Sequence, residues 1–124
     1  MPATYKSLVE AANAVVPKIS GKEAQEMVAN GALLVDVRDS AELAASGKAQ
    51  GSVHIPRGSL ELKADPTTSN PDKNFALDRP VILHCGGGGR AALAGKLLKD
   101  MGYEKVYNLG GLKDWAESGG KVEK

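Results

Sequence analysis

The chain has 124 residues, of which 42% are hydrophobic and 25% charged, values typical of one globular domain rather than a disordered or fibrous protein. Sixteen Lys and Arg against fifteen Asp and Glu leave a formal net charge of +1, which argues against nucleic acid or a membrane surface as the main partner. No apolar run approaches the roughly 20 residues needed to cross a bilayer, and a single cysteine offers neither an internal disulfide nor a metal cluster. We therefore expect a soluble cytoplasmic protein.

A first helix is predicted over residues 5–16, where apolar residues recur at helical spacing. Pro17 disfavours helical geometry for the residue before it, so the helix should end there. We interpret residues 1–17 as an N-terminal helical extension to a domain that occupies 18–124. The apolar side of this helix is expected to cover a sheet edge rather than to form a dimer contact.

A second helix and a first strand follow. Ser20 is a good N-cap and Glu23 stands three residues later, which is the capping-box spacing, while Gly31 is placed to end the helix. Residues 32–37 then form a short apolar run, typical of a strand buried on both faces.

The second half of the chain begins with a polar stretch, 58–79, that predicts a long surface excursion with one helical turn at its start. Apolar patterns after it predict a strand over 80–84, a helix over 91–101 and a short strand over 105–108. Strands that alternate with helices indicate an α/β fold, with a small parallel sheet flanked by helices on both faces.

A cysteine-containing loop separates the 80–84 strand from the next helix. Its residues are Cys85, Gly86, Gly87, Gly88, Gly89 and Arg90. The carboxyl end of a parallel strand is the usual ligand-binding edge of such a sheet. Unpaired amides of the loop and of the first helical turn can converge on an anion there and favour a thiolate, and the glycines leave those amides open. Cys85 is therefore a candidate nucleophile, with a positive charge nearby on Arg90.

Two other interpretations of this loop are weaker. Cys85 as a small buried hydrophobe would not require four consecutive glycines, which weaken an ordinary turn. A phosphate-binding loop would end in Gly-Lys-Ser/Thr, and a dinucleotide-binding loop would have an acidic partner on a second strand; both are missing here.

The chain resembles the rhodanese, or thiosulfate sulfurtransferase, family from about residue 19 to 120. The motifs that carry the resemblance occur in the family's order: 34–39 with Glu42, 51–56, 85–90, and 106–111 with Trp115 and Gly119. The match at 51–56 has few spacer residues, and Ala91 follows the all-glycine loop where many members have Ser or Thr, which leaves the choice of donor open.

The resemblance implies a rhodanese-like fold and a sulfurtransferase. Cys85 would take a sulfane sulfur from a small donor, thiosulfate or a persulfide, and pass it to cyanide or a thiol, with an acceptor protein as a further candidate. The loop glycines and Arg90 would bind the substrate, and Arg57 would either attract an anionic donor or be a solvated surface arginine. The chemistry requires no metal or organic cofactor.

Two alternative functions remain open. Phosphatases of the same fold also use a cysteine loop that ends in arginine, but with five intervening residues rather than four, and a phosphate ester needs the wider ring. Some rhodanese-like domains are binding modules that have lost the cysteine, which is present here.

Several polar residues outside the loop are assigned structural roles. Asp36, Arg38 and Glu42 are expected to pair with one another and fix a loop, although they could also line the site. His84 should face away from the Cys85 thiol, because neighbouring strand residues point to opposite faces. His54 is expected to be packed or hydrogen-bonded rather than catalytic.

Overall fold

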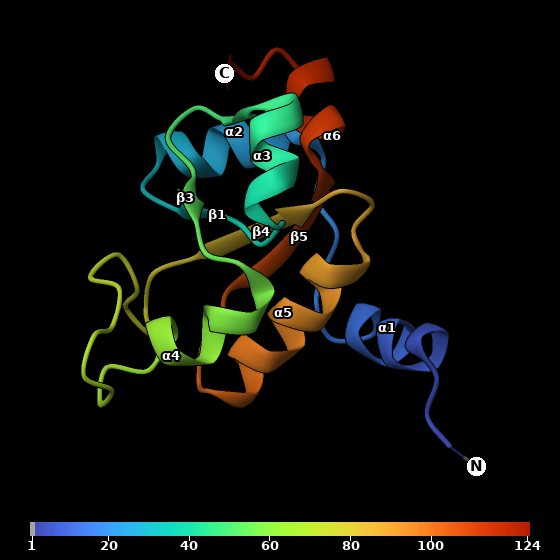
Figure 1. Cartoon of the computed structure of the whole chain (residues 1–124), viewed down its shortest axis with the longest axis vertical. Coiled ribbons are helices and arrows are strands. Elements are labelled where there is room, and N and C mark those ends of the chain that lie inside the picture. Colours follow the sequence, from blue (N-terminus) through green and yellow to red (C-terminus); the bar gives the residue numbers. More distant parts are fainter. Residues whose placement is uncertain (1) are drawn as a thin grey trace.

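The computed structural model describes residues 2–124 and has at its centre a parallel four-stranded sheet in the order β3-β1-β4-β5. Its strands are β1 (Leu33–Asp36), β3 (Val53–His54), β4 (Val81–Cys85) and β5 (Val106–Gly111). Helices lie on both sides of the sheet (Figure 1). The predicted fold class, α/β with a small parallel sheet between helices, is confirmed.

One face of the sheet packs against α4 (Leu60–Ala64) and α5 (Gly89–Asp100), and the other against α2 (Gly21–Ala29) and α6 (Leu112–Glu117). Side chains of β4 alternate between these layers: Leu83 and Cys85 belong to the cluster with α5, whereas Ile82 belongs to the cluster with Trp115 of α6. Both faces are therefore buried, which explains the uninterrupted apolar runs in the strands.

Helix α1 (Tyr5–Asn13) lies beside α5 rather than on the sheet (Figure 1). Ala12 and Val16 are fully buried, and a Cβ atom at Gly95 of α5 would lie only 2.9 Å from the Val16 methyls, so this glycine permits the close approach. The outer edge of β5, which is the last strand of the sheet, is covered instead by residues 17–19. The Asn108 N–H donates to the Pro17 carbonyl, and the Ile19 N–H donates to the Asn108 carbonyl. The prediction that the helix itself covers a sheet edge is therefore wrong: α1 packs on α5, and residues 17–19 after it cover the edge.

The connections contain further short elements. They are α3 (Ser40–Ser46), β2 (Lys48–Ala49), η1 (Arg57–Ser59) and β6 (Val122–Glu123). The antiparallel pair of β2 and β6 brings the C-terminal segment against the end of α3. Sequence patterns did not predict α3, because it buries no residue and so has no apolar periodicity, although the spacing of Asp39 and Glu42 is that of a capping box.

Two predicted boundaries change at the cysteine loop. Helix α5 begins at Gly89 rather than 91, and β4 continues through Cys85. Because β1 and β4 are parallel, their carboxyl ends meet at one edge, where Asp36 pairs in register with His84, the neighbour of Cys85. In residues 2–124, no helix is both long enough and apolar enough to span a membrane.

Candidate active site

The Cys85 thiol lies between the end of β4 and the start of α5. Its side chain is only 1% exposed, and the backbone N–H of Gly88 donates a hydrogen bond to Sγ at 3.0 Å. Helix α5 is 12 residues long, and the positive end of its dipole faces the same loop. The Gly88 amide and the start of α5 therefore both face the sulfur of Cys85.

The loop is held in shape by a side chain from β5. Gly88 has φ +96, a left-handed conformation that favours glycine, and its carbonyl accepts a hydrogen bond from Nδ2 of Asn108 at 3.0 Å. Asn108 is 1% exposed, and its Oδ1 accepts from the N–H of Gly110 at 2.8 Å. This role of Asn108 was not predicted from the sequence, where the only signal was an amide side chain in an otherwise apolar strand.

Arg90 forms a bidentate ion pair with Glu42 of α3. The Nη1–Oε1 and Nη2–Oε2 distances of this pair are 2.6 and 2.9 Å. The hydrogen bonds from Arg90 lower the pKa of Glu42 to about 2, and the Glu42 carboxylate raises the pKa of Arg90. The guanidinium therefore joins the cysteine loop to α3 beside Gly86, and both partners keep their charges at neutral pH.

A second ion pair, between Asp36 and Arg38, is more deeply buried than the pair of Glu42 and Arg90. Asp36 and Arg38 are 0% and 3% exposed, and Arg38 donates to both carboxylate oxygens of Asp36. Arg38 also donates to the Gly47 carbonyl at 2.7 Å and to Ser46 Oγ at 2.9 Å. Burial favours the neutral acid, but the bonds from Arg38 outweigh it and hold the pKa of Asp36 below its usual value. The pair therefore joins the segment before α3 to the C-terminal end of that helix.

Both histidines have the structural positions that were expected. His84 is fully buried on the opposite side of β4 from Cys85, and burial lowers its pKa, so the imidazole is neutral near pH 7. The Nε2 atom of His54 lies 2.7 Å from the Arg38 carbonyl. Asp36 and Arg38 pair as predicted, whereas Glu42 pairs with Arg90 instead of with Arg38.

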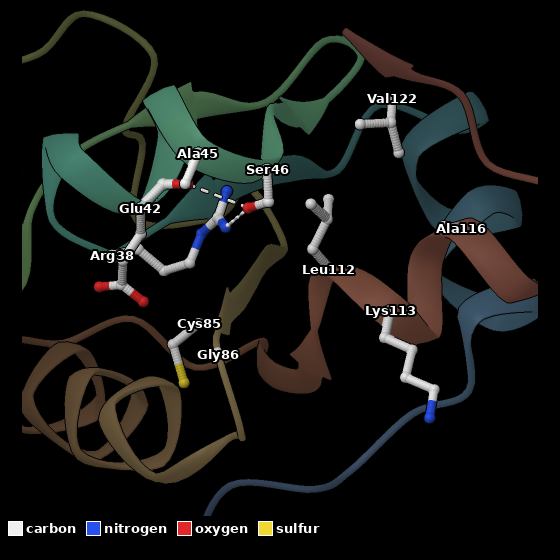
Figure 2. Close-up of a pocket in the computed structure, with 10 residues that line it drawn as sticks. All are labelled: Arg38, Glu42, Ala45, Ser46, Cys85, Gly86, Leu112, Lys113, Ala116 and Val122. Carbon is white, nitrogen blue, oxygen red and sulfur yellow. Dashed lines mark hydrogen bonds between the residues drawn. The ribbon is translucent and has the colours of Figure 1, made fainter. Parts of the chain in front are cut away.

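A cavity of about 530 Å³ opens beside Cys85 (Figure 2). At one end of the cavity are Cys85, Gly86 and the charged side chains of Arg38 and Glu42. At the other end are side chains of α6 and of the C-terminal segment. The lining residues are Arg38, Glu42, Ala45, Ser46, Cys85, Gly86, Leu112, Lys113, Ala116 and Val122. Among the residues predicted for the site, Cys85 and Gly86 line this cavity, whereas Gly87, Gly88, Gly89 and Arg90 do not; Arg90 is bonded to Glu42, which does.

Arg57 has a different environment. Its Nη1 atom pairs with Oε1 of Glu61 at 3.1 Å, and its side chain lines a separate hollow with Leu8 and Leu93. The structure therefore does not place Arg57 in the cavity beside Cys85.

The ion pair between Glu42 and Arg90 predicts a pH-dependent stability. Because the folded-state pKa of Glu42 is about 2 against an ordinary 4.5, the stabilisation is complete above pH 4.5 and is lost as the pH falls toward 2. Both side chains are about one-third exposed, so solvent limits the contribution to about 1 kcal/mol or less. Urea unfolding of the wild type and Glu42→Gln should show a difference that shrinks over this interval. A difference independent of pH would contradict the assignment.

Comparison with known proteins identifies related chains. The family model described as "Rhodanese-like domain" matches residues 20–118. The thiosulfate sulfurtransferase GlpE of Ectopseudomonas mendocina is 36% identical over 99 residues, which cover 79% of this chain and 83% of the relative.

Two solved structures cover nearly the whole chain. The Rhodopseudomonas palustris protein RPA3614, described as of unknown function and a possible tyrosine phosphatase, has a TM-score of 0.86 at 33% identity and 99% coverage of both chains. The polysulfide-sulfur transferase homodimer of Wolinella succinogenes has a TM-score of 0.76 at 34% identity, with 96% of this chain and 86% of that chain covered.

Proposed function

The chain belongs to the rhodanese-like domain family, and from this we propose that it is a sulfurtransferase that carries a sulfane sulfur as a persulfide on Cys85. The donor is thiosulfate or another small sulfane-sulfur anion, and the acceptor is cyanide or a thiol, free or on a protein. The observation that best supports this proposal is the Cys85 sulfur, held at 3.0 Å from the Gly88 N–H at the start of a long helix and bordering a cavity.

In the first half-reaction, the Cys85 thiolate attacks the outer sulfur of thiosulfate. A bond forms between Sγ and that sulfur, the sulfur–sulfur bond of thiosulfate breaks, and its electron pair leaves with sulfite. The resulting persulfide is a small anion. Backbone amides at a helix N-terminus stabilise such anions, and the hydrogen bond from the Gly88 amide to Sγ supports this role for the loop.

In the second half-reaction, the acceptor attacks the outer sulfur and the electron pair of the broken bond returns to Sγ. Because the thiol is only 1% exposed, an acceptor arriving through the cavity meets the outer sulfur, which stands about 2 Å beyond Sγ. Arg90 serves this site as a positioning residue, since its guanidinium is already bound to Glu42.

Phosphate ester cleavage is the alternative suggested by the description of the Rhodopseudomonas palustris protein. Four residues stand between Cys85 and Arg90. A phosphate monoester would also need donors directed at its oxygens, whereas two of the five N–H groups of Arg90 are bonded to Glu42, which fixes the orientation of the guanidinium. These features favour sulfur transfer.

Mass spectrometry tests the proposed function directly. After incubation of the reduced protein with thiosulfate, the peptide containing Cys85 should gain the mass of one sulfur atom, and cyanide should remove it as thiocyanate. In parallel, p-nitrophenyl phosphate should be turned over no faster than in a protein-free control. Absence of the added sulfur, together with phosphate hydrolysis that requires Cys85, would reverse the choice between the two reactions.

A further inference from the structure

The cavity beside Cys85 is much larger than the small substrates of the proposed reaction need. Its volume is about 530 Å³, whereas cyanide has two atoms and thiosulfate five. Cavities of roughly 300–1,000 Å³ are typical of sites that enclose small organic molecules. The additional space extends from the cysteine between α3 and α6 (Figure 2).

Apart from the exposed Lys113, the polar side chains that line the cavity lie at its cysteine end, and their hydrogen-bonding capacity is largely used. Arg38 bonds to Asp36, Ser46 and Gly47, and the Glu42 carboxylate bonds to Arg90. A ligand would therefore find few free polar partners along this wall. A polar ligand group placed there would lose its water without regaining hydrogen bonds.

The far end of the cavity is apolar. Leu112 and Val122 are half-buried and face the space from α6 and β6, and Ala45 and Ala116 border it from α3 and α6 (Figure 2). Lys113 also borders the cavity, but its ammonium lies 3.8 Å from the Glu117 carboxylate and its side chain is 82% exposed. The chemistry of this end suits a hydrocarbon group.

Two alanines determine how much of this space is open. Ala45 and Ala116 are both exposed on their helices, so a larger side chain at either position would not enter the core. Such a side chain would instead occupy the cavity. Small residues at these two positions therefore leave room for a bulky ligand.

We propose that this cavity selects an organic thiol with an apolar substituent as the sulfur acceptor, and that the small side chains of Ala45 and Ala116 leave room for that substituent. The proposal rests on the proposed sulfurtransferase function. The acceptor thiolate attacks the outer sulfur of the Cys85 persulfide, a new sulfur–sulfur bond forms, and the bond to Sγ breaks with its electron pair on Sγ. The products are an organic persulfide anion and the Cys85 thiolate, so no external oxidant or reductant is needed.

The test compares two acceptors, benzyl mercaptan and 2-mercaptoethanol, whose thiols have similar acidity but differ in apolar surface. Protein loaded with thiosulfate is freed of excess donor, and the rate of persulfide loss is followed by mass spectrometry at several acceptor concentrations. The wild type should discharge to benzyl mercaptan at least about tenfold faster, as expected for partial burial of a benzyl group. Equal rates would overturn the proposal.

Substitutions at Ala45 and Ala116 test whether the preference for benzyl mercaptan arises in this cavity. In Ala45→Phe, and independently in Ala116→Phe, the rate ratio of benzyl mercaptan to cyanide should fall roughly tenfold because the added ring fills the cavity. Ala44→Phe is the matched control: Ala44 is exposed on the same helix but does not line this cavity, and its ratio should be unchanged. An unchanged ratio in both cavity variants would overturn the proposal. Failure of the wild type to load sulfur, which is measured before any thiol is added, would instead overturn the proposed function.

Discussion

Replacing Cys85 with serine is expected to lower thiosulfate:cyanide sulfur transfer by roughly 10³-fold or more. The thiolate is the attacking group and the carrier of sulfur, whereas a serine hydroxyl does not ionise near neutral pH and cannot carry a persulfide. Steady-state thiocyanate formation and the mass of the thiosulfate-treated protein would both report the loss.

The fold should survive this substitution. A serine oxygen can accept the hydrogen bond that the Gly88 N–H now donates to Sγ, and the change in volume is small. A urea unfolding transition close to that of the wild type would therefore accompany the loss of activity. Retention of more than a few per cent of activity by a folded Cys85→Ser protein would rule out the persulfide mechanism.

Replacing Asp36 with asparagine is expected to reduce the free energy of unfolding by about 3–5 kcal/mol. Asp36 and Arg38 are almost completely buried, so the substitution leaves the Arg38 charge inside the protein without a compensating carboxylate. A loss of this size is a large part of the stability of a small domain. Urea unfolding at neutral pH, where both groups are charged in the wild type, measures it.

Glu117→Gln provides the comparison for this measurement. Glu117 pairs with Lys113 at 3.8 Å, and the two side chains are 66% and 82% exposed, so its removal should cost about 0.5 kcal/mol or less. If Asp36→Asn cost no more than this control, the bonds of Arg38 to Gly47 and Ser46 would be sufficient to hold it.

The parts of the fold that local patterns predicted are those in which neighbouring residues determine the structure. Ser20 and Glu23 form the expected capping box, with distances of 2.9 and 3.1 Å. The apolar runs predicted at 32–37 and 80–84 become the buried strands 33–36 and 81–85, and the glycine loop lies between a strand and a helix as predicted. The direction of Cys85 relative to His84 followed from strand alternation alone.

The parts that were missed depend on contacts between distant residues. Glu42 contacts Arg90 only because the sheet brings α3 beside the start of α5. Asn108 of β5 donates a hydrogen bond to Gly88, which follows β4. The cavity is likewise formed by α3, α6 and β6, which meet through the short pairing of β2 with β6. Two-residue strands such as β2 and β3 have too few side chains to show a period.

The four loop glycines are not equivalent, and the difference suggests a use for this chain in comparative enzymology. A side chain at Gly88 would be strained by the left-handed backbone, and one at Gly89 would collide with the Tyr5 hydroxyl. At Gly87, by contrast, no heavy atom of residues 2–124 outside Gly86–Gly88 lies within 4 Å of where a Cβ would be, and the backbone there does not have a positive φ. The four glycines therefore form a stretch without charged side chains and with one open position, Gly87, at which the influence of a single loop side chain on donor selectivity can be measured without rebuilding its surroundings.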